Sequence, residues 1–130
     1  MKIGIIAAND IRFSPYIFFY TRILDCLKYN YEIIYPHRSG IEDTTMQLQT
    51  HVITWHDHYG AAAAYTRYAI DVARVINREK YDALIVLTTA NAVFLMPYLK
   101  RHYRKRYIVD IRDYTHESIK PYFYLEKKAL

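Results

Sequence analysis

The sequence predicts an α/β fold, a doubly wound, Rossmann-like parallel sheet of about five strands with helices on both faces. Strand-forming runs alternate with helical patterns along the chain. The clearest of these runs are continuously apolar, as in strands that are buried on both faces of a sheet. Because crossovers between parallel strands are right-handed, the order of the elements favours the strand order 3-2-1-4-5.

The chain opens with a strand and a helix. Residues 2–8 predict a buried first strand, since isoleucines flank small residues there. After a loop at 9–13, Ser14 is placed to cap a helix and Pro15 suits its first position. The helix should end near Asn30. Its core face is expected to consist of Tyr16, Tyr20, Ile23, Leu24 and Leu27, which recur at helical spacing.

The middle of the chain predicts two further strands and a long helix. A short strand at 31–35 should stop at Pro36, and a weaker strand at 51–55 should follow a polar loop at 37–50. Four alanines then begin a helix that continues to about Arg78. Its apolar face is expected to consist of Tyr65, Tyr68, Ala69, Val72 and Ile76.

The last part of the chain predicts two strands, each followed by a helix. Residues 83–87 form the clearest buried strand after the first, and the helix that follows contains Pro97, which should kink it. Residues 107–111 predict the fifth strand, and a last helix is expected from Pro121. Since that helix reaches Leu130 without a stop signal, we expect the 130 residues to be the N-terminal domain of a longer, two-domain protein.

Composition narrows the class of protein. A chain of 130 residues, 52% of them hydrophobic, suffices for one domain with its own core. No uncharged apolar run approaches the roughly 20 residues that cross a bilayer, and no signal-peptide pattern opens the chain. The single cysteine, Cys26, is expected to be a core thiol and fits a reducing cytosol, so we expect a cytoplasmic protein.

The net charge of +5 is a local feature. It comes from five residues that we call the basic cluster, Lys100, Arg101, Arg104, Lys105 and Arg106. Without them, 13 basic and 13 acidic residues remain and cancel. The cluster fits either cations that complement the dipole of a helix C-terminus or a patch for anionic lipid head groups or another polyanion.

Polar side chains follow three of the expected strands, at the edge where the carboxyl ends of parallel strands meet. Small polar groups, carboxylates and an arginine on a rigid edge suit a hydroxyl-rich or phosphorylated ligand. The alternative is that Asp–Arg contacts there only tie loops together. The candidate residues are Asn9, Asp10, Arg12, Ser14, Thr88, Thr89, Asn91, Asp110, Arg112, Asp113, Tyr114 and His116.

Neither a metal nor a cofactor is expected. His51, His56 and His58 lie close in sequence, but no Cys or Glu cluster completes a metal site, so we expect exposed loop histidines. The three glycines lie outside any glycine-rich turn, which excludes a dinucleotide fingerprint and a P-loop. Basic residues gathered in one cluster, rather than along a face with exposed aromatics, also argue against nucleic-acid binding.

Three segments resemble the N-terminal half of a GT-B fold, GT4-like glycosyltransferase. They are residues 2–6, residues 81–86 and, above all, residues 107–113, Tyr-Ile-Val-Asp-Ile-Arg-Asp. Members of that family carry a strand that ends in DxRD or HD before a helix with a glutamate, and Glu126 would be that glutamate. The resemblance covers most of the chain.

The resemblance implies one half of a retaining enzyme that uses no bound metal. This domain would bind the acceptor, a glycan or a lipid-linked molecule, while a C-terminal domain would bind most of the nucleotide sugar. Arg112 and Asp113 would be the catalytic residues, and the loop from Asn9 to Arg12 would approach the donor phosphates. The isolated chain is then expected to be inactive. The basic cluster would dock the enzyme on the inner face of an anionic membrane.

A different class of function also fits the sequence. A flavodoxin-like module that binds a ligand or another protein without catalysis would show the same apolar strands and polar strand ends. Such a module would be complete as it stands.

Overall fold

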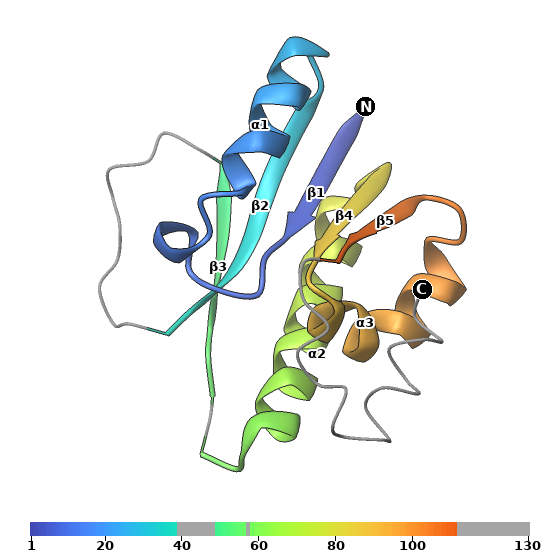
Figure 1. Cartoon of the computed structure of the whole chain (residues 1–130). Helices are drawn as coiled ribbons and strands as arrows, with labels where there is room; N and C mark the ends of the chain where they lie inside the picture. The colour runs from blue at the N-terminus through green and yellow to red at the C-terminus, as the bar shows by residue number, and fades with distance from the viewer. Residues whose placement is uncertain (39–48, 57, 112–130) are drawn as a thin grey trace.

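The structure, a computed structural model, has the α/β fold and the strand order that the sequence predicts. It describes residues 1–38, 49–56 and 58–111. Within them, five strands form one parallel sheet in the order β3-β2-β1-β4-β5 (Figure 1). In chain order the elements are β1 (Lys2–Ile6), the 3-10 helix η1 (Ile11–Phe13), α1 (Ile17–Cys26), β2 (Asn30–His37), β3 (Thr50–Thr54), α2 (Ala61–Glu79), β4 (Ala83–Leu87), α3 (Thr89–His102) and β5 (Tyr107–Asp110).

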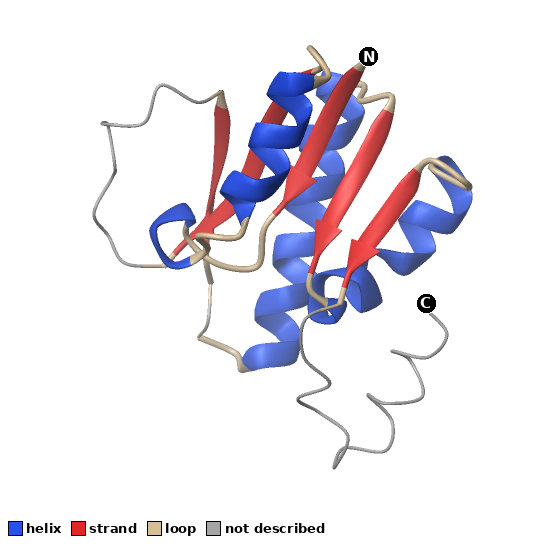
Figure 2. Ribbon diagram, turned by 45° about the horizontal axis from the view of Figure 1, so that its top comes forward, coloured by secondary structure: helices blue, strands red, loops and turns tan. Residues whose placement is uncertain are grey.

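The helices cover the two faces of the sheet unequally (Figures 1 and 2). On one face, Ile17 and Leu24 of α1 pack against aliphatic side chains of β1, β2 and β4. On the other face, α2 and α3 pack against each other and against the opposite side chains of β1 to β4. Among the α-helices described, α1 alone packs on the first face, so β5 has α-helix cover on one side only.

Parallel pairing brings the carboxyl ends of the strands to one edge of the sheet. Ile6, the last residue of β1, aligns with Ile34 of β2 and with Val86 of β4. The hydrogen bonding to β2 continues for one residue beyond β1, because the Ala7 N–H donates a hydrogen bond of 2.8 Å to the Ile34 carbonyl. The loops after β1 and β4 therefore leave the sheet side by side.

Gly4, in the middle of β1, allows a close approach of two side chains. A Cβ atom at this position would lie 2.9 Å from Leu84 Cδ2 and 2.9 Å from Tyr81 Cδ2. Both neighbours are buried in the core under α2 and α3. The absence of a side chain here lets the Tyr81 ring lie directly on the central strand.

Strand β2 does not stop before Pro36, as expected, but continues to His37. Pro36 pairs in register with Ile53 of β3, although it has no N–H to donate. Backbone groups of successive residues point to opposite sides of a strand, so those of Pro36 point to the same side as those of Ile34, whose carbonyl accepts a hydrogen bond from Ala7 after β1. The missing N–H of Pro36 therefore points to the side where β1 has already ended, so no ladder bond is lost.

Helix α1 begins later and ends earlier than the sequence predicts. Its N-cap is Tyr16, so neither Ser14 nor Pro15 has the predicted place at the start of the helix. Instead these residues form a turn, in which the Ile17 N–H donates to the Ser14 carbonyl at 3.0 Å. The helix ends at Cys26 rather than near Asn30, where β2 starts.

The face that α1 turns to the core is narrower than expected. Ile23 and Leu27, both predicted core residues, are each 55% exposed, and Cys26 is an exposed thiol rather than a core thiol. The apolar residues of α1 extend around more of the helix than one sheet can cover, so some must face outward. The residues of α1 that are buried are Ile17, Thr21 and Leu24.

Adding one methyl group at Gly4 should test the close contact on β1. Gly4→Ala should lower the free energy of unfolding by about 1–3 kcal/mol, because the buried Tyr81 ring and Leu84 must move. Thr54→Ala, at an exposed side chain of β3, should change it by no more than about 0.5 kcal/mol. Urea unfolding of both variants measures the difference, and equal effects would contradict the contact.

Candidate functional site

Part of the predicted site lies at one edge of the sheet, as expected. The loop after β1 carries Asn9, Asp10 and Arg12, and the turn after β4 carries Thr88. The Thr88 N–H donates a hydrogen bond of 3.0 Å to the carbonyl of Asp110, which joins the ends of β4 and β5. The predicted residues Arg112, Asp113, Tyr114 and His116, with Glu126 and the helix from Pro121, lie outside the described residues.

Asp10 and Arg12 are bonded to each other. The Asp10 carboxylate is buried and accepts hydrogen bonds from the Arg12 backbone N–H at 3.2 Å, from Nε at 3.2 Å and from Nη2 at 3.1 Å. These bonds hold the pKa of Asp10 below its usual range although burial acts in the opposite direction. His37 Nδ1 lies 3.5 Å from the same carboxylate. Here an Asp–Arg contact does fix a loop, as the alternative interpretation expects.

Three buried side-chain oxygen atoms at this edge have no hydrogen-bond partner within the part of the chain that is described. They are Ser14 Oγ, Thr88 Oγ1 and Asn91 Oδ1. Asn91 is 2% exposed, and its orientation is fixed because its Nδ2 donates to the Leu87 carbonyl at 3.0 Å. Buried polar atoms in proteins are nearly always satisfied, so three such atoms among the predicted site residues indicate a place for ligand groups.

The backbone at Thr88 is in an unfavourable conformation. Its φ of 73° and ψ of 146° are backbone dihedral angles that a β-branched residue rarely adopts. Thr88 is the N-cap of α3, but its side chain makes no capping hydrogen bond. The first N–H groups of α3, starting at Thr89, point out of the helix end, where the helix dipole favours negative charge. Strained residues of this kind concentrate at binding and catalytic sites.

Arg38 and a group of aromatic side chains extend this edge on the β3 side, and the sequence analysis missed them. The Arg38 guanidinium lies 3.7 Å from the centre of the Trp55 ring and donates a hydrogen bond of 3.1 Å to the Ala8 carbonyl. Tyr65 meets the Trp55 ring edge-on at 5.1 Å and stacks on Phe94 at 5.4 Å. The signal that could have found Arg38 is its position just after the second strand.

A second polar group lies at the opposite, amino edge of the sheet, and its hydrogen bonds are satisfied. The Glu32 carboxylate is bonded to Tyr81 Oη at 2.6 Å, to His51 Nε2 at 2.9 Å and to Lys2 Nζ at 3.1 Å. His51 lies in a strand, as the strand predicted at 51–55 requires, but its side chain belongs to a network and is not an exposed histidine, whereas His56 is exposed as predicted.

This network has three possible metal ligands but does not fit a metal. Ligand atoms of Glu32, His51 and Glu79 lie within 4.8 Å of one another. The Lys2 ammonium already lies 3.1 Å from both carboxylates, in the position of a cation. Arg78 Nη2, a donor, lies 3.3 Å from His51 Nδ1, which favours the tautomer whose Nε2 carries the proton. A metal would require that nitrogen to be deprotonated.

The environment of Glu32 favours its charged form. Burial alone would raise the pKa of the carboxyl, but hydrogen bonds from Tyr81, His51 and Lys2 outweigh burial and lower the pKa. Burial and the adjacent Glu32 carboxylate raise the pKa of Tyr81 far above its usual value, so Tyr81 remains a donor at every ordinary pH. The network therefore links β1, β2, β3 and β4 through one carboxylate.

Comparisons with known proteins assign the chain to no family. No model of a protein family matches the sequence, and no curated protein matches it significantly. Among the helices that the structure describes, none combines the length and apolar character that a membrane span requires. Function therefore has to be argued from the site itself.

The Glu32 network should make stability depend on pH. A carboxyl whose pKa is lowered in the folded state stabilises the protein above its unfolded pKa, about 4.3 for Glu, and this contribution is lost as the pH falls through the folded value. Glu32→Gln should therefore cost about 1–3 kcal/mol of unfolding free energy near neutral pH. The difference from the unchanged protein should shrink on acidification to about pH 3.

Urea unfolding across that pH range measures this difference. Asp71→Asn provides the matched control, because Asp71 pairs with Arg67 and Arg74 on the exposed side of α2. Such pairs contribute about 0–1 kcal/mol. A Glu32→Gln effect that stays the same from neutral to acidic pH would contradict the role of the ionised carboxylate.

Proposed function

We propose that this domain binds a hydroxyl-rich ligand at the carboxyl edge of its sheet, as the acceptor-binding half of a GT-B glycosyltransferase. The observation that carries the proposal is the set of three buried oxygen atoms that have no partner among the described residues, Ser14 Oγ, Thr88 Oγ1 and Asn91 Oδ1. All three belong to residues that the sequence analysis selected as ligand-binding. Leaving such an atom unpaired costs about 1–3 kcal/mol, which a bound ligand would restore.

The chemistry of these atoms supports a ligand with hydroxyl groups. Asn91 Oδ1 can only accept hydrogen bonds, whereas the hydroxyl groups of Ser14 and Thr88 can donate as well as accept. A sugar hydroxyl both donates and accepts, so one kind of ligand group satisfies all three atoms. The uncapped start of α3 adds backbone N–H donors, which suit a phosphate or another anionic group of the same ligand.

The charges at this edge support a role on the acceptor side of the reaction. A departing nucleoside diphosphate must be stabilised by cations and helix N-termini. In the described part of the edge, the Arg12 guanidinium is bonded to Asp10, and Arg38 is stacked on Trp55. Most of the stabilising charge would therefore come from a second domain that holds the nucleotide sugar.

The basic cluster is placed for a contact separate from this site. Lys100 and Arg101 lie in the last turn of α3, whereas Arg104, Lys105 and Arg106 are exposed in the turn before β5. Lys100 and Arg101 complement the helix dipole from within the last turn, and Arg106 does so from outside the helix, because its Nη2 donates a hydrogen bond of 2.8 Å to the His102 carbonyl. The turn lies at the amino edge of the sheet, so we propose that peripheral contact with an anionic membrane leaves the carboxyl edge accessible to a glycan or lipid-linked acceptor.

The second candidate function is a binding or interaction module without catalysis. It is favoured by the Asp10–Arg12 pair, since two groups that neutralise each other are poor candidates for proton transfer. Both candidates require a ligand at the carboxyl edge. They differ in whether sugar is transferred.

Removal of the unpaired hydroxyl groups should separate ligand binding from stability. Ser14→Ala and Thr88→Val each delete an oxygen that has no partner, so stability should stay the same or rise while ligand affinity falls about tenfold. Thr21→Val is the matched control: its hydroxyl donates to the Phe18 carbonyl at 3.1 Å, so this variant should lose stability and keep affinity.

Nuclear magnetic resonance titrations with a panel of oligosaccharides and sugar phosphates measure the affinities, and thermal unfolding measures stability. Binding should perturb the amide signals of residues 9–14 and 88–91. A ligand that binds elsewhere, or variants that bind as tightly as the unchanged protein, would refute the site.

Transfer of sugar tests the enzymatic part of the proposal. In the full-length polypeptide, Arg112→Ala and Asp113→Ala should each lower the rate of transfer from a nucleotide sugar at least about a hundredfold, because the resemblance gives these residues the catalytic role. Arg104→Ala, in the basic cluster, should leave transfer to a water-soluble acceptor unchanged. Hydroxyl-dependent ligand binding without any sugar transfer would favour the non-catalytic module.

A further inference from the structure

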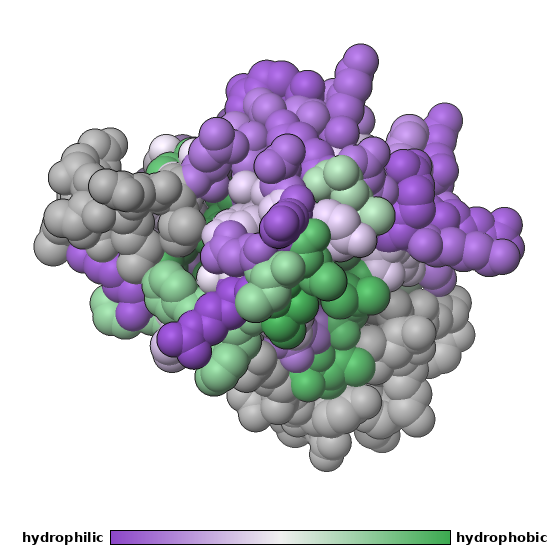
Figure 3. Space-filling view, turned by 90° about the horizontal axis from the view of Figure 1, so that it is seen from above, coloured by the Kyte–Doolittle hydropathy of each residue, from purple (hydrophilic) through white to green (hydrophobic). Residues whose placement is uncertain are grey.

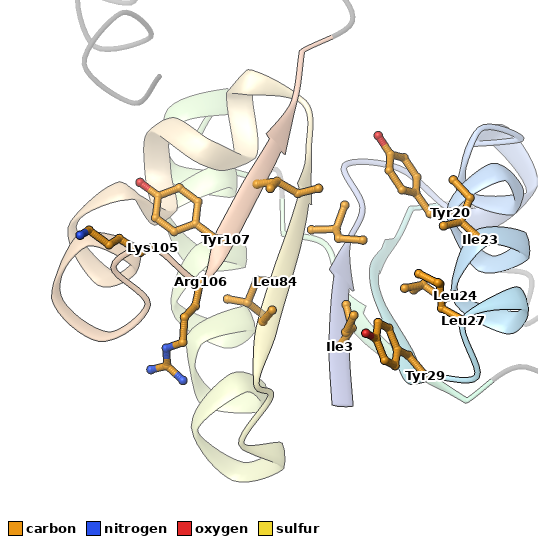
Figure 4. Close-up of a pocket in the computed structure, with 13 residues that line it drawn as sticks. Ile3, Tyr20, Ile23, Leu24, Leu27, Tyr29, Leu84, Lys105, Arg106 and Tyr107 are labelled. Atoms are coloured by element: carbon orange, nitrogen blue, oxygen red, sulfur yellow. The ribbon is translucent and has the colours of Figure 1, made fainter. Parts of the chain in front are cut away.

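A groove lies between α1 and β5, on the face of the sheet that α2 and α3 do not cover (Figure 4). We call it the α1–β5 groove. It encloses about 460 Å³, with Ile3 and Ile85 among the residues of its floor. Ile23 and Leu27 of α1 form one wall, and Ile108 belongs to the other. The lining is almost wholly apolar, so water is a poor occupant.

The walls of the groove expose large apolar side chains to solvent. Ile108 is 57% exposed, and Ile23 and Leu27 lie four residues apart on α1 at 55% each. Phe19, four residues before Ile23, continues the same stripe at 65%. Single exposed apolar residues are ordinary, but a continuous stripe beside a groove is typical of an interaction site. Figure 3 shows a hydrophobic surface near the middle of the view, with hydrophilic residues above it.

The width of the groove matches one helix. Helix α1 packs mainly over β1 and β2 and reaches β4 only through the core cluster that they share, which leaves most of β4 and all of β5 on this face without a described helix. Neighbouring strands are about 4.8 Å apart, so two strands present a strip about 10 Å wide. Packed helices lie about 8–10 Å apart axis to axis. A single helix beside α1 would therefore cover the strip and the exposed stripe together.

We propose that the α1–β5 groove binds an amphipathic α-helix of a partner protein, with acidic residues along the border of its apolar face. Among the described residues that line the groove, Lys105 and Arg106 are the charged ones. A neighbouring cavity continues this positive border with Lys100 and Arg104. Carboxylates on the helix would complement these cations and set its orientation, while the apolar stripe would supply affinity.

The shape of the surface favours a helix over a lipid bilayer. The floor residues Ile3 and Ile85 are only 6% and 7% exposed and lie recessed between the walls. A bilayer is best met by apolar side chains that project from the surface, whereas a recessed floor requires an occupant that projects into it. The groove is also separate from the carboxyl edge, so this interaction is independent of the proposed sugar ligand.

Two designed peptides of about 18 residues provide the probes. Both carry leucines at helical spacing; one borders them with Glu and the other with Lys. Fluorescence anisotropy should show binding of the Glu peptide and at least about fivefold weaker binding of the Lys peptide. Ile108→Asp and Ile23→Asp should each weaken binding of the Glu peptide about tenfold or more. Ile70→Asp, 47% exposed on α2, is the matched control and should bind normally.

Charge reversal sharpens the test. The double variant Lys105→Glu, Arg106→Glu should prefer the Lys peptide. Ile23 and Ile108 are exposed, so their single variants should keep their unfolding temperatures, and Ile23→Asp still tests the groove if Ile108→Asp does not fold. Arg106 Nη2 donates a hydrogen bond of 2.8 Å to the His102 carbonyl at the end of α3, so the double variant should lose some stability, and its preference between the two peptides is the readout. Failure of the Glu peptide to bind, or equal binding by all variants, would overturn the proposal.

Two other occupants would also overturn the proposal. One is a membrane, which would be shown by Ile108-dependent binding to phosphatidylglycerol vesicles without binding of the Glu peptide. The other is the chain itself, which would be shown by a cross-link from the thiol of the Ile108→Cys variant to residues 112–130. Neither result would alter the expected binding of sugar ligands at the carboxyl edge.

Discussion

The arrangement of both the core and the candidate site depends on the pairing of β1 with parallel strands on both sides. From β1 the chain first moves outward through β2 to β3, and then returns across the sheet to β4 and β5. The loops after β1 and β4 therefore leave the sheet at neighbouring positions, where the chain reverses direction. The buried Tyr68 hydroxyl holds this point, since it donates a hydrogen bond of 2.7 Å to the Ala7 carbonyl. Because the backbone is fixed there, the side chains that follow β1 and β4 have defined positions.

The two edges of the sheet differ in how their buried polar groups are satisfied. At the amino edge, Glu32 is saturated by a hydroxyl, an imidazole and an ammonium, and these bonds link four strands. At the carboxyl edge, the oxygen atoms of Ser14 and Asn91 are buried without described partners, although the neighbouring Asp10 is fully engaged. A protein core that needed polar groups only for stability would satisfy both edges. The contrast supports our proposal that the carboxyl edge binds a ligand, while the amino edge stabilises the fold.

The sequence predicts the fold well because continuous apolar runs determine which strands are central, and right-handed crossovers determine their order. The sequence predicts structural details less well where they depend on which side of a helix or strand contacts another part of the chain. Pro36 stays in its strand because its missing N–H points past the end of β1. The positions of Thr88 and Asp110 follow from strand ends, whereas the contact of Arg38 with Trp55 depends on tertiary packing that no local pattern contains.

Helix α1 shows why helical periodicity has to be combined with the topology of the sheet. Apolar spacing identifies residues that avoid water, but it does not identify what they contact. Ile23 and Leu27 satisfy the periodic pattern as well as Leu24 does, yet only Leu24 faces the sheet. A helix whose apolar stripe is wider than its sheet contact has to expose the remainder or cover it with another element. On this face, the exposed apolar side chains of α1 border the uncovered surface of β4 and β5. The distance from this stripe to the edge of the sheet is therefore the width of one helix and not that of one side chain.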